Sequence, residues 1–157
     1  MPRVISQRQL TWRKHIQSNR QHLDVKLRAT SWLLGRRSHL SLPNQLLLYK
    51  CILKPVWTYG IQLWGCAKPC HTQILQPLQS KILRYLANAP WYVSNFQLHT
   101  EFGIPFVSAE IYRSYLLYHS RLAGHGNALV ATPYTLPNVA RRLKRRWPLD
   151  LYTVTGE

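Results

Sequence analysis

The sequence predicts an all-α fold, a small bundle of four or five helices followed by a basic, partly irregular C-terminal tail. Apolar residues recur at helical spacing in several stretches. Residues that begin or end helices flank these stretches. Hydrophobic residues make up 46% of the 157 residues, and a chain of this length can bury roughly 70% of its unfolded surface. A packed core between helices is therefore expected.

The first expected helix covers residues 11–34 and has the clearest amphipathic pattern. Seven positions follow a 3.6-residue period, and five of them are apolar: Trp12, Ile16, Asn19, Leu23, Leu27, Thr30 and Leu34. Gly35 comes next, as is common after the last turn of a helix. The basic residues of this segment lie largely off the stripe: Arg13, Lys14, Arg20, Lys26 and Arg28. We expect the stripe to face the core and the cations to face solvent.

The second expected helix begins after Ser41, a residue type that caps helix N-termini, and tolerates Pro43 in its first turn. It is predicted to run to Leu53. Pro55 should kink or restart it, because proline lacks an N–H donor and clashes with the preceding turn.

An aromatic segment follows, and its large side chains are expected to belong mainly to the core. These residues are Trp57, Tyr59 and Trp64, and Gly60 among them is expected to permit close helix packing. Cys51 occupies a position that suits a core residue of the preceding helix.

Three more helices are predicted after a turn at residues 65–70. One covers about 72–87, a short one runs from the Ser94 cap to Phe102, and the last runs from Ser108 to about Ala123. After residue 123 the composition becomes rich in glycine, proline and polar residues, which indicates a linker before the basic tail.

Charge gives the strongest functional signal. The chain has 21 Lys and Arg against five carboxylates, a formal net charge of +16. Such a charge attracts polyanions, and nucleic acid is the partner we expect, with an anionic membrane as the weaker alternative. The predicted contacts are phosphate contacts that do not read sequence. The expected contact residues are Arg13, Lys14, Arg20, Lys26, Arg28, Arg36, Arg37, Lys50, Lys54, Arg141, Arg142, Lys144, Arg145 and Arg146.

No catalytic or metal site is expected. The carboxylates are scattered along the chain at Asp24, Glu101, Glu110, Asp150 and Glu157, whereas two-metal phosphoryl transfer needs converging acids. The seven histidines form no catalytic pattern. Cys66, Cys70 and His71 lack a second ligand pair at zinc-site spacing. We therefore expect neither a cofactor nor a small-molecule substrate.

The cysteines and the apolar stretches bear on localisation. Three cysteines form no disulfide framework, and the basic first twenty residues lack the apolar block of a signal peptide. Lysines interrupt the strongest apolar stretches before they reach the ~20 residues of a membrane span. We expect a soluble protein of the nucleus or cytoplasm that is not secreted and does not enter a membrane.

Five stretches in order along the chain carry a more specific signal. They are LTWRKHI (10–16), LLLYKCILKPVWTYGIQLWG (46–65), ANAPWYVSN (87–95), FGIPFV (102–107) and RRLKR-x-x-PLDL (141–151). The core K-P-x-x-x-Y-G-x-x-x-W spans 54–64. In these stretches the chain resembles the reverse transcriptases of jockey-type non-LTR retrotransposons.

The resemblance implies a thumb that grips the template–primer during target-primed reverse transcription. Residues 1–10 would be a remnant of the segment next to the palm, 11–90 the thumb-like bundle, 91–123 a helical C-terminal extension, and 124–157 the linker and basic tail. The palm aspartates that bind Mg²⁺ and the endonuclease would lie outside this chain, and an upstream palm would be its protein partner.

The sequence departs from the family pattern at Ser6, Gln7 and Pro43. This drift supports an alternative, in which the chain is an inert or domesticated piece of a decayed element. A second alternative is a free-standing basic RNA-binding protein.

Overall fold

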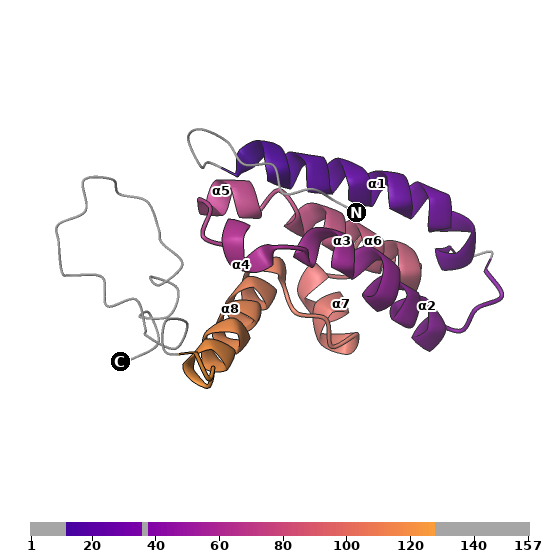
Figure 1. The fold of residues 1–157 in the computed structure, drawn as a ribbon. Helices are drawn as coiled ribbons and strands as arrows, with labels where there is room; N and C mark the ends of the chain where they lie inside the picture. Colours follow the sequence, from indigo (N-terminus) through magenta and orange to yellow (C-terminus); the bar gives the residue numbers. More distant parts are fainter. Residues whose placement is uncertain (1–11, 36–37, 128–157) are drawn as a thin grey trace.

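A computed structural model describes residues 12–35 and 38–127, and every regular element in these ranges is helical, which confirms the all-α prediction. Helix α1 (Arg13–Leu34) runs along one side of the molecule (Figure 1). Its predicted stripe faces inward: Ile16, Leu23 and Leu34 are buried in the core. Asn19 on the same stripe is buried as well, and its amide lies 3.2 Å from Nε2 of the buried His15.

Three consecutive segments form one continuous helix beside α1. They are α2 (Leu42–Leu48), the π-helical turn η1 (Tyr49–Leu53) and α3 (Lys54–Thr58). The helix therefore continues through Pro55 instead of restarting. In the π-helical turn the Lys54 N–H donates to Tyr49 O, five residues back, instead of four. This wider turn precedes the proline, whose ring would clash in a regular α-helix.

A left-handed glycine separates α3 from α4 (Ile61–Trp64). Gly60 has φ 63°, a conformation that costs other L-residues roughly 1–2 kcal/mol. Trp57 and Trp64 are buried as expected, and the Trp64 indole donates to Tyr59 O at 3.0 Å. The Tyr59 ring itself is exposed, contrary to the expectation for this segment.

Close packing of helices occurs at Gly65. A Cβ on Gly65 would lie 2.7 Å from Ile111 Cγ2, so α4 approaches α8 (Val107–Ala123) at a distance that only glycine allows. The predicted turn after Gly65 is shorter than expected, because α5 (Pro69–Thr72) begins at Pro69. Cys51 is exposed, since the register of the π-helical segment turns it away from the core.

The last helices follow the predicted order with shifted starts. Helix α6 covers Gln76–Ala87, with Pro77 in its first turn, where the missing N–H costs least. Helix α7 covers Asn95–Glu101, and the predicted Ser94 cap is confirmed: Ser94 and Gln97 form a reciprocal capping box. Helix α8 begins at Val107, close to the predicted Ser108 start.

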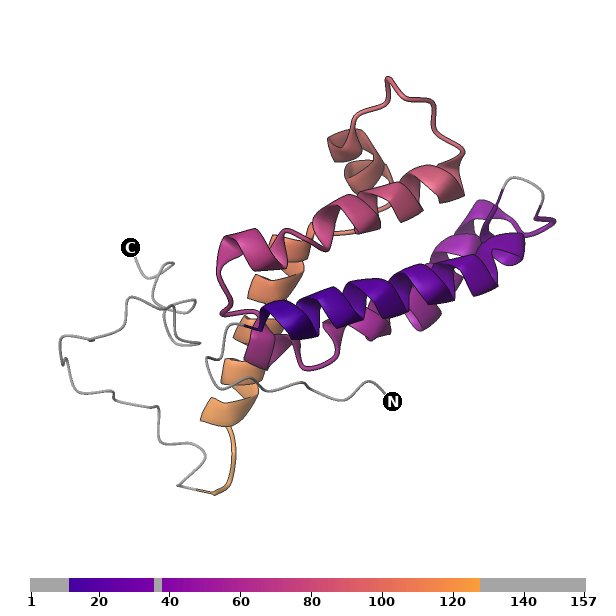
Figure 2. The same cartoon turned by 90° about the horizontal axis from the view of Figure 1, so that it is seen from above.

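Three long helical segments contact one another, and the last two helices, α7 and α8, pack against them. Helix α1, the composite helix and α6 pack together, α7 packs on α6, and α8 crosses at the end near α4 (Figure 2). A single hydrophobic core includes Ile16, Trp57 and Ile82 together with Ile104 and Ile111 from beyond residue 90. The division into domains near residue 90 stays a prediction, and segment 1–10 and residues 128–157 of the predicted segment 124–157 lie outside the described residues.

Candidate nucleic-acid interface

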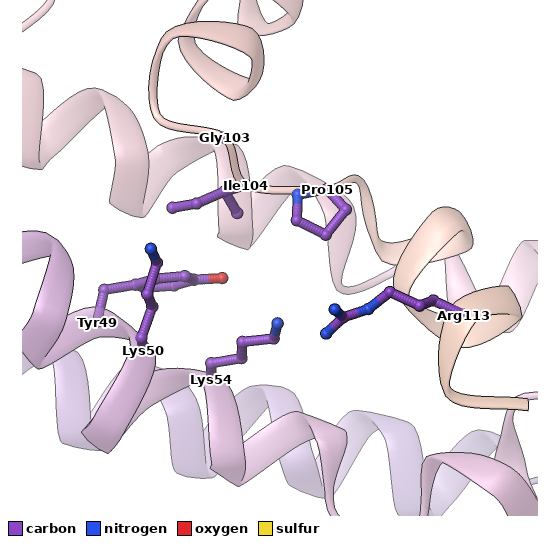
Figure 3. A pocket seen from close by; sticks show the side chains of 7 residues that line it. All are labelled: Tyr49, Lys50, Lys54, Gly103, Ile104, Pro105 and Arg113. Atoms are coloured by element: carbon purple, nitrogen blue, oxygen red, sulfur yellow. The ribbon is translucent and has the colours of Figure 1, made fainter. Parts of the chain in front are cut away.

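A cavity of about 270 Å³ lies between the composite helix, the segment before α8 and α8 itself. Its lining residues come from these three places: Tyr49, Lys50, Lys54, Gly103, Ile104, Pro105 and Arg113. In Figure 3 the side chains of Lys54 and Arg113 point toward one another across the cavity, and Lys50 stands one helical turn before Lys54. Three cations thus converge from two helices that are far apart in the sequence.

Glu110 holds two of these cations in place. Its Oε1 lies 2.8 Å from Lys54 Nζ and 3.1 Å from an Arg113 guanidinium nitrogen. The Glu110 side chain is almost fully buried, whereas the Arg113 side chain is largely exposed. The second carboxylate oxygen, Oε2, is buried and accepts no hydrogen bond within the described residues. The carboxylate therefore serves as an internal anchor for Lys54 and Arg113.

The protonation state of Glu110 follows from these contacts. Burial by itself would raise its pKa, but hydrogen bonds from Lys54 and Arg113 and their positive charges together lower the pKa below the usual value. Glu110 is thus ionised at neutral pH. Three cations and one carboxylate leave the site with two net positive charges, an electrostatic match for an anionic group.

A buried tyrosine supports one wall of the cavity. Gln79 Nε2 donates both to the Tyr49 hydroxyl, at 3.1 Å, and to Pro105 O, at 3.0 Å. Gln79 therefore ties η1 to the segment that precedes α8. Burial raises the pKa of Tyr49 to about 12, an effect that the hydrogen bond from Gln79 only partly offsets. The phenol stays neutral at pH 7 and adds no negative charge to the cavity.

The predicted cations of α1 are exposed, but they do not form one face. At about 100° per residue, Arg13, Arg20 and Arg28 lie within about 80° of one another beside the buried stripe. Lys26 flanks the stripe on its other side, and Lys14 points farther outward by the same geometry. The structure thus brings three of these five cations to a common strip. Asp24 lies within that strip by the same spacing and reduces its charge.

Of the remaining predicted contact residues, two lie at the cavity and the others lie outside the described residues. Lys50 is exposed at the cavity, and Lys54 is half-buried in its ion pair. The other predicted contact residues lie outside the described residues: Arg36, Arg37, Arg141, Arg142, Lys144, Arg145 and Arg146.

Sequence reasoning missed Arg113 and Glu110 as members of the site. Three residues apart on one helix, they can form a local ion pair, but this spacing does not point to a third partner. Nothing local links either of them to Lys54, because the contact depends on how α8 packs against the rest of the bundle.

A metal site or a membrane span would be the other candidates within residues 12–35 and 38–127. No group of three His, Cys, Asp or Glu side chains there is placed to hold a metal ion. Among the same residues, no helix combines the length and apolar character that crossing a bilayer requires.

The sequence is similar to polymerases of mobile elements over nearly its whole length. It is 41% identical over 150 residues to the probable RNA-directed DNA polymerase from transposon X-element of Drosophila melanogaster, a match covering 96% of this chain and 16% of that protein. It is 36% identical over 158 residues to the RNA-directed DNA polymerase from mobile element jockey of Drosophila funebris, covering 94% of this chain and 17% of that protein.

A third relative is more distant. The probable RNA-directed DNA polymerase from transposon BS of Drosophila melanogaster is 30% identical over 139 residues, with 88% of this chain and 15% of that protein covered. The chain thus spans about a sixth of the length of the curated relatives it matches. No protein-family model and no solved structure matches it.

Proposed function

We propose that this chain, which is similar to the RNA-directed DNA polymerases of jockey-type mobile elements, is the part of such an enzyme that holds template–primer nucleic acid. One observation carries this proposal: Lys50, Lys54 and Arg113 converge on a cavity with a net positive charge. The expected ligand is the phosphate backbone of an RNA–DNA or DNA duplex.

The geometry of the site favours phosphate over base recognition. Lysine ammonium groups and an exposed guanidinium bind phosphate oxygens irrespective of sequence. Glu110 orients Lys54 and Arg113 before any ligand arrives, which lowers the entropic cost of binding. The strip of Arg13, Arg20 and Arg28 on α1 offers further phosphate contacts. The thumb role implied by the resemblance agrees with such a surface.

We further propose that this chain does not catalyse nucleotide transfer by itself. Glu110, a buried carboxylate of the described ranges, is already neutralised by Lys54 and Arg113. Nucleotide transfer by two metal ions needs several acids that share those ions. The Mg²⁺-binding aspartates would then belong to a palm outside this chain. Primer extension by the purified chain with Mg²⁺ tests this point, and any extension would contradict it.

Salt-dependent binding tests the phosphate contacts. Fluorescence anisotropy of a labelled RNA–DNA duplex, measured over a salt series, gives the slope of log affinity against log salt concentration. If about five phosphates are neutralised, the slope should be about −4.5. A salt-independent affinity would contradict the proposal.

Charge-matched variants locate the interface. The double variant Lys50→Gln/Arg20→Gln removes two exposed cations of the proposed surface, and its slope should become less steep by about 2. The control Lys68→Gln/Arg121→Gln removes the same charge from two other exposed positions and should retain the wild-type slope. Equal losses in both variants would indicate general attraction to the +16 chain and would contradict a defined site.

A further inference from the structure

The loop between α6 and α7 presents aromatic rings to solvent. Trp91 and Tyr92 of this loop are 87% and 72% exposed, and Phe96 in the first turn of α7 is 68% exposed, whereas Trp57 and Trp64 of the same chain are buried. Large aromatic side chains gain most when they leave water, and a cluster left on the surface marks a binding site more often than chance exposure. Ring exposure here is concentrated within six residues of sequence.

The loop is braced by a single arginine. The Arg84 guanidinium donates to Pro90 O at 2.7 Å, to Val93 O at 2.7 Å and to Asn95 Oδ1 at 3.0 Å. The Val93 N–H also donates to Pro90 O, which closes a turn around the two central rings. The loop backbone is thus fixed from α6 to the start of α7.

Two features at the loop ends add to this rigidity. Asn88 ends α6 in the left-handed conformation, with φ 47°, and Ser94 begins α7 with its capping box. The backbone that carries the rings is therefore already ordered, so a ligand would not have to order the loop when it binds.

The position of the loop gives the rings free access. In Figure 2 the connection between α6 and α7 projects from the bundle at the end opposite to α8. The rings of Trp91 and Tyr92 meet edge to face, with centroids 6.0 Å apart and planes at 81°. This arrangement leaves the face of at least one ring open for stacking.

From these observations we propose that the α6–α7 loop is a stacking platform for unpaired nucleobases, with Arg84 as its positioning residue. The inference rests on the proposed function, because it assumes that nucleic acid is the ligand. Every nucleobase has a π face, so stacking on aromatic rings tolerates any sequence.

Charge favours a nucleic acid over a protein as the occupant. No acidic residue lies between Arg84 and Thr100, and Lys81 is exposed one turn before Arg84 on α6. A polyanion with flat bases matches both the cations and the rings, and the chain as a whole carries +16. The rings would engage a single-stranded extension while the cationic cavity engages backbone phosphates.

The test compares two DNA ligands with equal numbers of phosphates, a blunt duplex and a duplex with a single-stranded overhang. The 157-residue chain should bind the overhang ligand more tightly. Trp91→Ala should lower affinity for the overhang ligand about tenfold, from the usual effect of removing one stacking partner. Its affinity for the blunt duplex should not change.

Two further variants test whether any exposed tryptophan, or the charge of Arg84 alone, would explain the result. Trp32→Ala removes a tryptophan of α1 that is similarly exposed and should keep the preference for the overhang. Arg84→Gln leaves all the rings in place but removes the brace. It should weaken the preference and also speed amide hydrogen exchange at residues 91–95, a change that a merely cationic role would not produce.

The outcomes separate this proposal from the one on which it rests. Steeply salt-dependent binding of the blunt duplex without any preference for the overhang would retain the phosphate interface and overturn the platform. Loss of all duplex binding in the wild type would overturn the proposed function itself. An unchanged overhang preference in Trp91→Ala would overturn the platform and assign the exposed rings to a protein contact.

Discussion

Lys54 of α3 and Glu110 of α8 form an ion pair with a 2.8 Å separation, and the carboxylate is almost fully buried. This contact joins the composite helix to the last helix at the rim of the basic cavity. It links the stability of the fold to the shape of the candidate site.

Removing Lys54 should destabilise the protein more than removing Arg113. Lys54→Met leaves a buried carboxylate with only one, mostly exposed partner, and we expect a loss of about 2 kcal/mol in the free energy of unfolding. Arg113→Gln should cost less than about 1 kcal/mol, since that side chain is largely solvent-exposed. Urea denaturation measures both values. The double variant Lys54→Met/Glu110→Leu should recover most of the loss, and additive losses would contradict the pairing.

Acid should weaken the fold through Glu110. Its pKa is lowered in the folded state, so the unfolded chain binds more protons near and below the ordinary value of 4.5. The stabilisation is therefore complete above that pH and is lost as pH falls through the folded-state pKa. Thermal unfolding between pH 6 and pH 3 should show a smaller loss of Tm in Glu110→Gln than in the wild type. Identical losses would show that Glu110 does not contribute.

His15 should add a second pH dependence at higher pH. Burial lowers its pKa below 6.5, so the unfolded chain again binds more protons than the folded chain in the window below 6.5. Stability should rise with pH through that window and fall on acidification. His15→Gln keeps an acceptor for the Asn19 amide but does not titrate. Its denaturation midpoint should change less between pH 7.5 and pH 5.5 than that of the wild type.

Gly65 should tolerate no side chain. In Gly65→Ala the new Cβ would meet Ile111 Cγ2 at 2.7 Å and Ile61 O at 2.6 Å, and overpacking of this kind typically costs about 1–3 kcal/mol. Ile111→Ala removes the Cγ2 atom that the new Cβ would meet, so Gly65→Ala/Ile111→Ala should lose less stability than the two single variants added together. If the double variant loses as much free energy of unfolding as the two single variants together, or more, α8 does not pack on α4 as described. Chemical denaturation of the wild type, the two single variants and the double variant measures these free energies.

Local signals accounted for a large share of the fold. The stripe through Ile16, Leu23 and Leu34 placed α1, and Ser94 marked the start of α7 through a cap that depends only on its neighbours. The course of the chain at Pro55 was less predictable. A π-helical turn and a restarted helix both relieve the proline clash, and the residues nearby do not choose between them.

The sequence by itself determined the helical character of this protein, its positive charge and its relationship to mobile-element polymerases, because periodicity, charge and motif order are properties of the chain alone. Tertiary structure decided which charges act together. Glu110 and Arg113 reach Lys54 only after α8 packs against α4 through Gly65, and the exposed rings of the α6–α7 loop are held by contacts from Arg84. The contacts of Lys54 with α8 arise from the packing of whole helices, which no local pattern encodes.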